Sequence, residues 1–292
     1  FYKKKIMKII KYFFEFIFIG ILLLIFRITG YRSASNIGAF IGEKIGPLFR
    51  SKKKIISNIK KAFPKLEEKK INFIIKNMWS NYGRILADYM FIKNFRTLKL
   101  KPYLQIEGKE IFEEIKKKDE QVVFISGHFN NFELMAMEIE KSGIDVGAIY
   151  RPLNNIFLNK IMEKIRKSHI CKNQIKKGIS GVREIIRLYK NGFSIALMID
   201  QRVSEGMKLN FFGYPALTTT IPAQLVKKFG CRIVPVYIER FDNLYYKMSV
   251  NKPLKFEKNQ SIEDISSILN KELENMILKN PEQWIWSHNR WK

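Results

Sequence analysis

The sequence is poor in cysteine and histidine, the residues that most often hold metals or form cross-links. Its two cysteines, Cys171 and Cys231, form no C-x-x-C pair, so neither a disulfide framework nor a zinc knuckle is indicated, and a reducing compartment is expected. Its three histidines, His128, His169 and His288, are not spaced as ligands, so we expect no metal site. A G-x-S-x-G elbow, a Walker loop and a G-x-G-x-x-G fingerprint are also missing, which argues against the enzyme classes that carry them.

Acidic residues are scarce beside basic ones. The chain has 53 Lys and Arg against 27 Asp and Glu, a net charge of +26 that concentrates anionic partners near its surface. Nucleic acid, anionic lipid and an acidic carrier protein all fit this charge, and a merely solvated lysine surface is the plainer alternative. Hydrophobic residues make up 46% of the 292 residues, which excludes a disordered or fibrous chain and allows one large α/β domain or two small ones.

The N-terminal region contains a long apolar run, YFFEFIFIGILLLIF, from Tyr12 to Phe26, in which Glu15 is the one charge. Fifteen residues of helix span roughly 22 Å, less than the roughly 30 Å of a hydrocarbon core, so both spanning and lying in the interface remain open. No small-residue cleavage site follows, so we expect a retained anchor over residues 1–30 rather than a signal peptide. Basic residues flank the run: Lys3, Lys4, Lys5, Lys8 and Lys11 before it, and Arg27, Lys52, Lys53, Lys54, Lys60 and Lys61 after it. The larger downstream excess favours a cytoplasmic main body.

The rest of the chain predicts helices followed by an α/β alternation. Apolar positions at three- and four-residue spacing predict helices over residues 50–95, broken at Pro64. Short β-branched and apolar runs then predict strands with helices between them. The predicted strands are Val122–Ser126, Val146–Tyr150, Phe193–Ile199 and Ile233–Glu239. We therefore expect a mixed central sheet flanked by helices in one domain over residues 31–292, helical from 31 to 100 and α/β from 101 to 292.

Several local patterns give narrower expectations. Glycines at four-residue spacing predict a face for close helix approach, either to a second helix within the membrane or by tight packing against the domain; they are Gly38, Gly42 and Gly46. Ser180 is expected to cap a helix that runs to Lys190, and Thr219 or Thr220 to precede a helix that begins near Pro222 and ends at Gly230. A last amphipathic helix is expected over Ser261–Lys279.

The segment VVFISGHFNNFEL predicts a strand that ends at Gly127, a turn, and a helix that begins near Asn130 or Asn131. His128 and Glu133 would lie about 140° apart on a regular helix, but they can meet across a strand-to-helix junction. There Glu133 would accept a hydrogen bond from one imidazole nitrogen and leave the other free to take a proton. A purely structural histidine is the alternative.

The same segment resembles a known family. HFNNFE fits the H-x-x-x-x-D/E motif of the lysophospholipid acyltransferase superfamily and looks like that of the lipid A biosynthesis late acyltransferases (lauroyl/myristoyl acyltransferases). Matching blocks in the same order are NIKKAFP, IEGKE, SGHFNNFEL, YRPLNN, MIDQR, FFGYPALTTT and PEQWIWSHNRWK. The family's motif usually reads G-H-x-G-N-W-E, so Asn130 replaces a glycine and Phe132 a tryptophan; asparagine tolerates a left-handed backbone better than most residues.

This resemblance implies a glycerolipid-acyltransferase-like fold and transfer of an acyl chain from an acyl carrier protein thioester to a hydroxyl of a lipid A precursor. It implies catalysis by His128 and Glu133 at the cytoplasmic face of the bacterial inner membrane. Membrane lipids are expected partners, and neither a further cofactor nor nucleic acid is expected. Another glycolipid or aminolipid acceptor is the nearest alternative, and a non-catalytic basic membrane-binding protein is the alternative from another class.

The resemblance and the strand ends also suggest residues that touch the substrate. Arg166 corresponds to a family arginine near the active site and Arg151 lies in the YRPLNN block, so either can hold a phosphate or stabilise developing negative charge. Asp200 and Gln201 follow a strand, where an α/β sheet presents polar groups to a ligand, although closing a turn is an equal alternative. We add Asn131 to the expected substrate-binding set.

Overall fold

The computed structural model describes residues 2–292, with side chains from residue 6 on. Its first element, α1 (Tyr2–Phe49), changes direction at Gly30, whose φ of 77° lies in the left-handed region that glycine adopts without strain. Among the described residues, α1 is the one helix long and apolar enough to cross a membrane, and most of its apolar surface is exposed. Exposed apolar side chains in this number are typical of a segment that contacts lipid.

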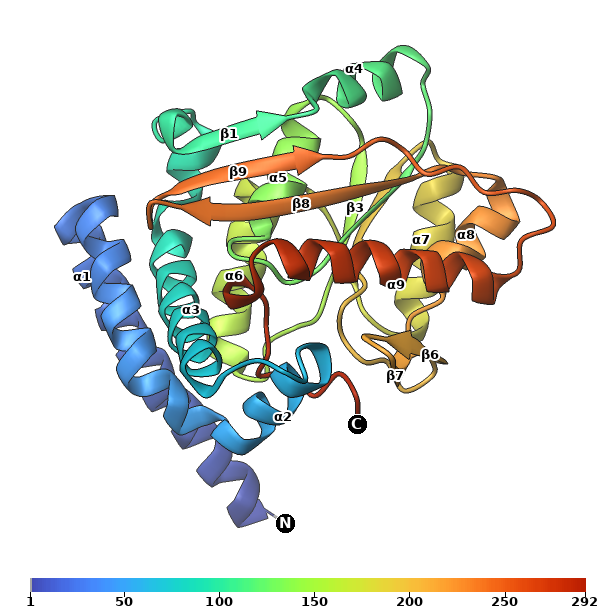
Figure 1. Ribbon diagram of the computed structural model, residues 1–292. Helices are drawn as coiled ribbons and strands as arrows, with labels where there is room; N and C mark the ends of the chain where they lie inside the picture. Colours follow the sequence, from blue (N-terminus) through green and yellow to red (C-terminus); the bar gives the residue numbers. More distant parts are fainter. Residues whose placement is uncertain (1) are drawn as a thin grey trace.

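The second half of α1 lies along α3 (Glu68–Arg96), beside the short helix α2 (Lys52–Ala62) (Figure 1). The break between α2 and α3 contains Pro64, as predicted. The glycine face of α1 supplies the contact: a Cβ on Gly38 would lie 2.4 Å from the Gly83 carbonyl oxygen, and one on Gly42 would lie 2.1 Å from the Trp79 carbonyl oxygen. The face therefore serves tight packing within the domain, the second of the two alternatives.

Replacing Gly42 with alanine is expected to destabilise the protein by about 1–3 kcal/mol, the usual cost of overpacking, because the clash is with the backbone of α3 and no side chain can move aside. Thermal unfolding in detergent measures the effect. Gly20→Ala is the matched control, since nothing lies within 4 Å of its added Cβ and helix propensity favours alanine. An unchanged Tm for Gly42→Ala would mean that the two helices do not pack this closely.

A seven-stranded mixed sheet forms the centre of the domain, in the order β1-β9-β8-β2-β5-β3-β4. Strands β8, β2, β5, β3 and β4 run parallel, β9 is antiparallel to β8, and β1 is parallel to β9. The bounds are β1 Leu104–Glu107, β2 Val123–Ser126, β3 Val146–Tyr150, β4 Asn173–Lys176, β5 Ser194–Met198, β8 Ile233–Phe241 and β9 Tyr245–Val250. A separate hairpin pairs β6 (Met207–Phe211) with β7 (Tyr214–Thr218). The expected fold class, a mixed sheet flanked by helices, is confirmed.

Helices cover both faces of the sheet, and Figure 1 shows α9 in front of it with α5, α6 and α7 behind. Their bounds are α4 Lys109–Lys117, α5 Glu133–Lys141, α6 Ile156–His169, α7 Ile179–Lys190, α8 Ile221–Phe229 and α9 Ile262–Lys279. The helical elements also include two short 3-10 helices, η1 (Lys101–Tyr103) and η2 (Pro281–Gln283). Because the parallel strands share one direction, their carboxyl ends and the loops after them meet at one edge.

The four predicted strands are confirmed to within two residues at each end, because each is an apolar run buried between helices. Other expectations need correction. Helix α5 begins at Glu133 rather than near Asn130, and α7 begins at Ile179, so Ser180 lies inside the helix instead of capping it. The remaining strands, β1, β4, β6, β7 and β9, were not predicted, since polar residues alternate along them and weaken the apolar signal.

Candidate active site

His128 lies two residues beyond the end of β2, in a loop that the sequence and the packing hold rigidly. Asn130 takes a φ of 43°, the left-handed conformation that asparagine tolerates in place of the family's glycine. Its side-chain amide donates to the Ile238 carbonyl oxygen at 3.0 Å and to the Gln283 side chain at 2.6 Å. The loop is thereby tied to β8 and to the C-terminal segment, which keeps His128 at a defined position.

The imidazole of His128 is paired with Asp200. The Nδ1 atom of His128 lies 2.7 Å from Asp200 Oδ1, and the backbone N–H of His128 donates to Oδ2 at 2.8 Å. The indole Nε1–H of Trp284 donates to the same Oδ2 at 2.9 Å. Burial by itself raises the pKa of Asp200, but the charge of His128 and these hydrogen bonds outweigh it and bring the pKa to about 2. Asp200 is therefore a buried carboxylate that binds the Nδ1 edge of the imidazole and does not occupy Nε2.

Glu133 does not make the expected hydrogen bond to His128. Its Oε1 accepts instead from Arg166 Nε at 2.8 Å, from Arg166 Nη2, and from the hydroxyl of Tyr89. Burial and then the charge of Glu133 raise the pKa of Tyr89 well above its usual value, so the phenol stays a donor. Burial alone would lower the pKa of Arg166, but Glu133 reverses this and the guanidinium is charged. Glu133 and Arg166 thus form a buried ion pair.

Strand register explains why Asp200, and not Glu133, meets His128. Strands β2 and β5 are parallel neighbours with Ser126 opposite Met198. The residues two positions further along each chain, His128 and Asp200, therefore lie side by side. Glu133 is the first residue of α5, and its side chain turns toward Tyr89 on α3 and Arg166 on α6. The sequence contained one signal for this, the MIDQR block at the end of a predicted strand, but it could not tell which strands are neighbours.

A cavity of about 320 Å³ opens beside His128. His128, Glu133, Arg151, Arg166 and Gln201 all line it, so five of the seven expected site residues share one cavity. Most of the remaining wall is apolar and comes from β2, α5, β3, α6 and β5; it includes Phe124, Phe132, Met135, Ala136, Ile139, Ala148, Ile149, Ile170, Ala196, Leu197 and Met198. An apolar cavity with a few polar groups at one end suits an amphiphilic ligand.

The other two expected substrate-binding residues lie outside the cavity wall. Asp200 is fully buried beneath the imidazole, and Asn131 is fully buried in the loop before α5. Neither amide atom of Asn131 has a hydrogen-bond partner among the described residues. Packing shields both side chains from the cavity here, and their contact with a substrate stays a prediction. Gln201 does face the cavity, with Nε2 3.4 Å from both ring nitrogens of His128.

Residues of the C-terminal segment support the site from behind. Trp284 is almost fully buried and holds Asp200, and His288 Nε2 accepts the backbone N–H of Arg202 at 3.1 Å. Sequence reasoning recognised the PEQWIWSHNRWK block as part of the resemblance but assigned it no role, and it missed Tyr89 altogether. An aromatic residue in an amphipathic helix is predicted to lie in the core. Nothing in the neighbouring sequence indicates that the Tyr89 hydroxyl reaches the carboxylate of Glu133, 44 positions away.

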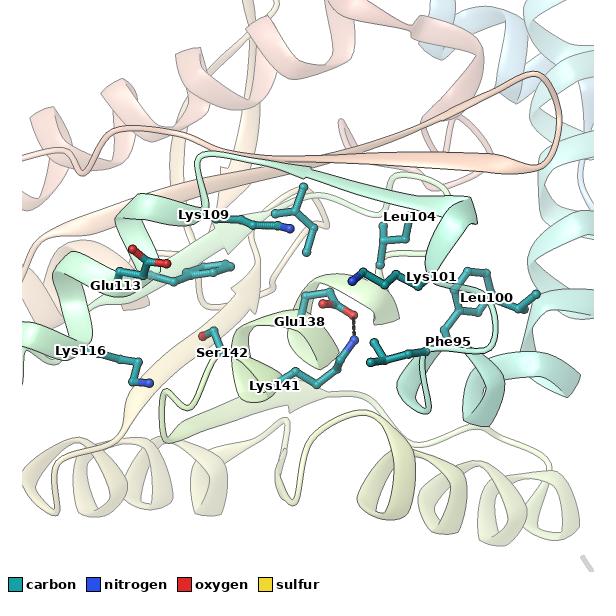
Figure 2. Close-up of a pocket in the computed structure, with 13 residues that line it drawn as sticks. Phe95, Leu100, Lys101, Leu104, Lys109, Glu113, Lys116, Glu138, Lys141 and Ser142 are labelled. Atoms are coloured by element: carbon teal, nitrogen blue, oxygen red, sulfur yellow. Dashed lines mark hydrogen bonds and ion pairs between the residues drawn. The ribbon is translucent and has the colours of Figure 1, made fainter.

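Two further features help to delimit the site. Cys171 is buried, its thiol contacts the Val146 carbonyl oxygen, and burial raises its pKa to about 12, so it is no reactive thiolate. A larger cavity of about 500 Å³ lies between the end of α3, β1, α4 and the end of α5. Figure 2 shows Lys101 and Lys109 reaching into this second cavity and Glu138 paired with Lys141. No histidine or cysteine lines it, so the cavity beside His128 is the candidate active site.

Fold and site together define a class: an α/β protein in which a buried carboxylate holds a histidine beside a mostly apolar cavity, an arrangement typical of enzymes. The comparisons with known proteins make this specific. The chain belongs to the bacterial lipid A biosynthesis acyltransferase family, whose model matches residues 2–292. It is therefore an O-acyltransferase, and the resemblance drawn from its motifs is confirmed.

Individual relatives are distant but match along most of their length. The lipid A biosynthesis myristoyltransferase of Escherichia coli is 20% identical over 256 residues, which are 86% of this chain and 77% of that protein. The lipid A biosynthesis palmitoleoyltransferase of the same organism is 22% identical over 272 residues, 87% and 84% of the two chains. Among solved structures, the 1-acyl-sn-glycerophosphate acyltransferase of Thermotoga maritima is similar with a TM-score of 0.42 at 13% identity, covering 88% of this chain and 100% of that one.

Proposed function

We propose that this protein transfers a fatty acyl chain from an acyl carrier protein thioester to a hydroxyl of a lipid A precursor, with His128 as the general base. The observation that carries the proposal is the 2.7 Å contact between His128 Nδ1 and Asp200 at the edge of an apolar cavity. The names of the relatives, which are lipid A biosynthesis acyltransferases, support the acceptor.

The reaction follows from the geometry of the base. With Nδ1–H donated to Asp200, Nε2 of His128 takes the proton of the acceptor hydroxyl as its oxygen attacks the thioester carbonyl carbon. The tetrahedral oxyanion then collapses, the C–S bond breaks, and the thiolate leaves with the proton from the imidazolium. Asp200 stays ionised throughout, fixes the tautomer and stabilises the imidazolium, because its pKa lies far below neutrality.

Arg166 supplies positive charge to the same cavity. It lines the cavity, and its ion pair with Glu133 fixes the plane of its guanidinium. A positive charge held in this way stabilises the developing oxyanion electrostatically without having to reorganise. We therefore propose that Glu133 contributes to catalysis by positioning Arg166, while Asp200 positions His128.

The apolar helix brings the cavity to a membrane. The Asn155 side chain, which caps α6, donates to the Tyr12 carbonyl oxygen at 2.8 Å and to Glu15 at 3.1 Å, so the one charge in the apolar run is used to fasten α1 to α6. The Phe157 ring packs against Phe13 and Phe16 of α1. Since α6 also lines the cavity through Arg166, lipid held against α1 lies near the cavity entrance. The net charge of +26 suits anionic lipid and an acidic carrier protein at the cytoplasmic face of the inner membrane.

The test is mass spectrometry of the lipid products after the purified protein is incubated with acyl carrier protein thioester and a tetra-acylated lipid A precursor. We expect one added acyl chain, with release of the carrier's free thiol in equal amount. The same mixture with acyl carrier protein lacking its acyl group is the control. Transfer to a different glycolipid or aminolipid, with none to the lipid A precursor, would overturn the acceptor assignment and leave the mechanism standing.

A further inference from the structure

Three basic residues line the active-site cavity: Arg166, Arg151 and Lys177. Arg166 is more than nine-tenths buried, and while Nε and Nη2 bind Glu133, its Nη1 has no hydrogen-bond partner among the described residues. A buried charged donor without a partner costs free energy, and it lines the cavity. Such a donor is typical of a site that is completed by a bound acceptor.

Two more basic residues are brought to the same place by the sheet. Strands β3 and β4 are parallel neighbours with Tyr150 opposite Lys176, so the next residue on each, Arg151 and Lys177, lies side by side at the carboxyl edge. The Lys177 backbone N–H donates to the Tyr150 carbonyl oxygen at 2.8 Å, which continues the pairing beyond the last strand residue. Both side chains line the cavity that His128 lines.

No carboxylate of the described residues lies within ion-pair distance of these two cations. Neither Arg151 nor Lys177 therefore forms an ion pair among these residues, in contrast to Arg166. Burial and the charge of Arg151 lower the pKa of Lys177. The charges of Glu205 and Asp200 raise it, but they do not outweigh the first two effects. Two neighbouring like charges repel each other, and an anion bound between them removes the repulsion.

We propose that Arg151, Lys177 and the free Nη1 of Arg166 form a subsite for a phosphate group of the substrate. The inference rests on the proposed function and deepens it, since both substrates contain such a group: the headgroup of the lipid acceptor, and the phosphodiester of the carrier's pantetheine arm. A phosphate offers several acceptor oxygens and so matches donors that approach from three elements. Lys177 takes part through its charge, and sequence reasoning did not include it.

Equilibrium dialysis with radiolabelled inorganic phosphate tests the subsite independently of catalysis. We expect the Arg151→Ala/Lys177→Ala double variant to bind phosphate at least tenfold more weakly than the unchanged protein, because two charged hydrogen bonds are lost. Lys101→Ala/Lys109→Ala, which removes the same charge from the second cavity, is the matched control and is expected to bind phosphate normally. Equal affinity in all three proteins, or equal loss in both double variants, would overturn the subsite.

Steady-state kinetics then identifies which substrate supplies the phosphate. If it is the acceptor, Lys177→Ala raises KM for the phosphorylated acceptor about tenfold with kcat nearly unchanged, and has no further effect on the dephosphorylated acceptor. If it is the carrier's arm, the same rise appears in KM for the acyl carrier protein thioester and vanishes with an acyl-N-acetylcysteamine thioester. Phosphate binding without any acyl transfer would keep the subsite and overturn the proposed function. Acyl transfer whose kinetics change in neither the Arg151→Ala nor the Lys177→Ala variant would keep the proposed function and overturn the subsite.

Discussion

Replacing His128 with alanine is expected to lower kcat by about 10²- to 10⁴-fold, because the acceptor hydroxyl then has no positioned base to take its proton. The effect should appear in kcat, while KM for the acyl donor stays within a few-fold, since the rest of the cavity wall is unchanged. Acyl transfer to the lipid acceptor in detergent, followed by mass spectrometry, measures it. His169→Ala is the matched control, because His169 ends α6 and does not line the cavity.

Loss of the imidazole also removes a partner from Asp200, so a folding defect must be separated from a catalytic one. Asp200 would keep its hydrogen bonds from the His128 backbone N–H and from Trp284. His128→Gln retains a side chain that can donate to Asp200 but cannot act as a base at neutral pH. A His128→Gln protein with an unchanged Tm and full activity would show that His128 is not the base.

Replacing Asp200 with asparagine is expected to lower kcat by a comparable amount. In the serine protease triad, removing the charge of the aspartate behind the histidine costs about 10⁴-fold, because the imidazole then adopts the wrong tautomer and its charged form is no longer stabilised. The same argument applies here, since Asp200 contacts Nδ1 at 2.7 Å and is shielded from solvent. The substitution keeps the side chain's volume, and circular dichroism and Tm check that the fold persists.

Glu133→Gln is the matched comparison for Asp200→Asn. Glutamine can still accept from Arg166 and Tyr89 through its carbonyl oxygen, but it leaves the buried Arg166 without a counter-charge. Breaking a buried ion pair in this way costs about 3–5 kcal/mol, so we expect a lower Tm and a smaller loss of kcat than for Asp200→Asn. If a stable Glu133→Gln protein lost as much kcat and Asp200→Asn lost little, then Glu133 would be the partner that matters for catalysis.

Much of the site could be predicted from local sequence. The strand before His128 is a run of buried apolar residues, and the glycine and asparagines after it predict a turn, so His128 was correctly expected at the end of a central strand. Arg166 and Arg151 were assigned through the resemblance, and both line the cavity. The apolar N-terminal helix follows from composition, because the run from Tyr12 to Phe26 contains one charged residue. A helix of this composition has no polar face, so whichever side is exposed is apolar.

Other parts depend on which strands and helices become neighbours. Asp200 lies 72 positions from His128 and reaches it because β5 pairs with β2 in one register, and a shift of one residue would turn its carboxylate to the opposite face of the sheet. Tyr89 and Trp284 reach the site only through the packing of α3 and of the C-terminal segment. Arg151 and Lys177 become neighbours through the pairing of β3 with β4.

The sequence by itself determined the four central strands, the apolar N-terminal helix and the place of His128 after a strand, because hydrophobic periodicity, turn residues and one motif act over a few residues. The tertiary structure decided which carboxylate contacts His128 and which holds the arginine. Glu133 begins α5 and Asp200 follows β5, and both lie at the same edge of the sheet, so the residues around each do not tell them apart. Strand order and register do, since they bring Asp200 within hydrogen-bonding distance of His128 and turn Glu133 toward Arg166.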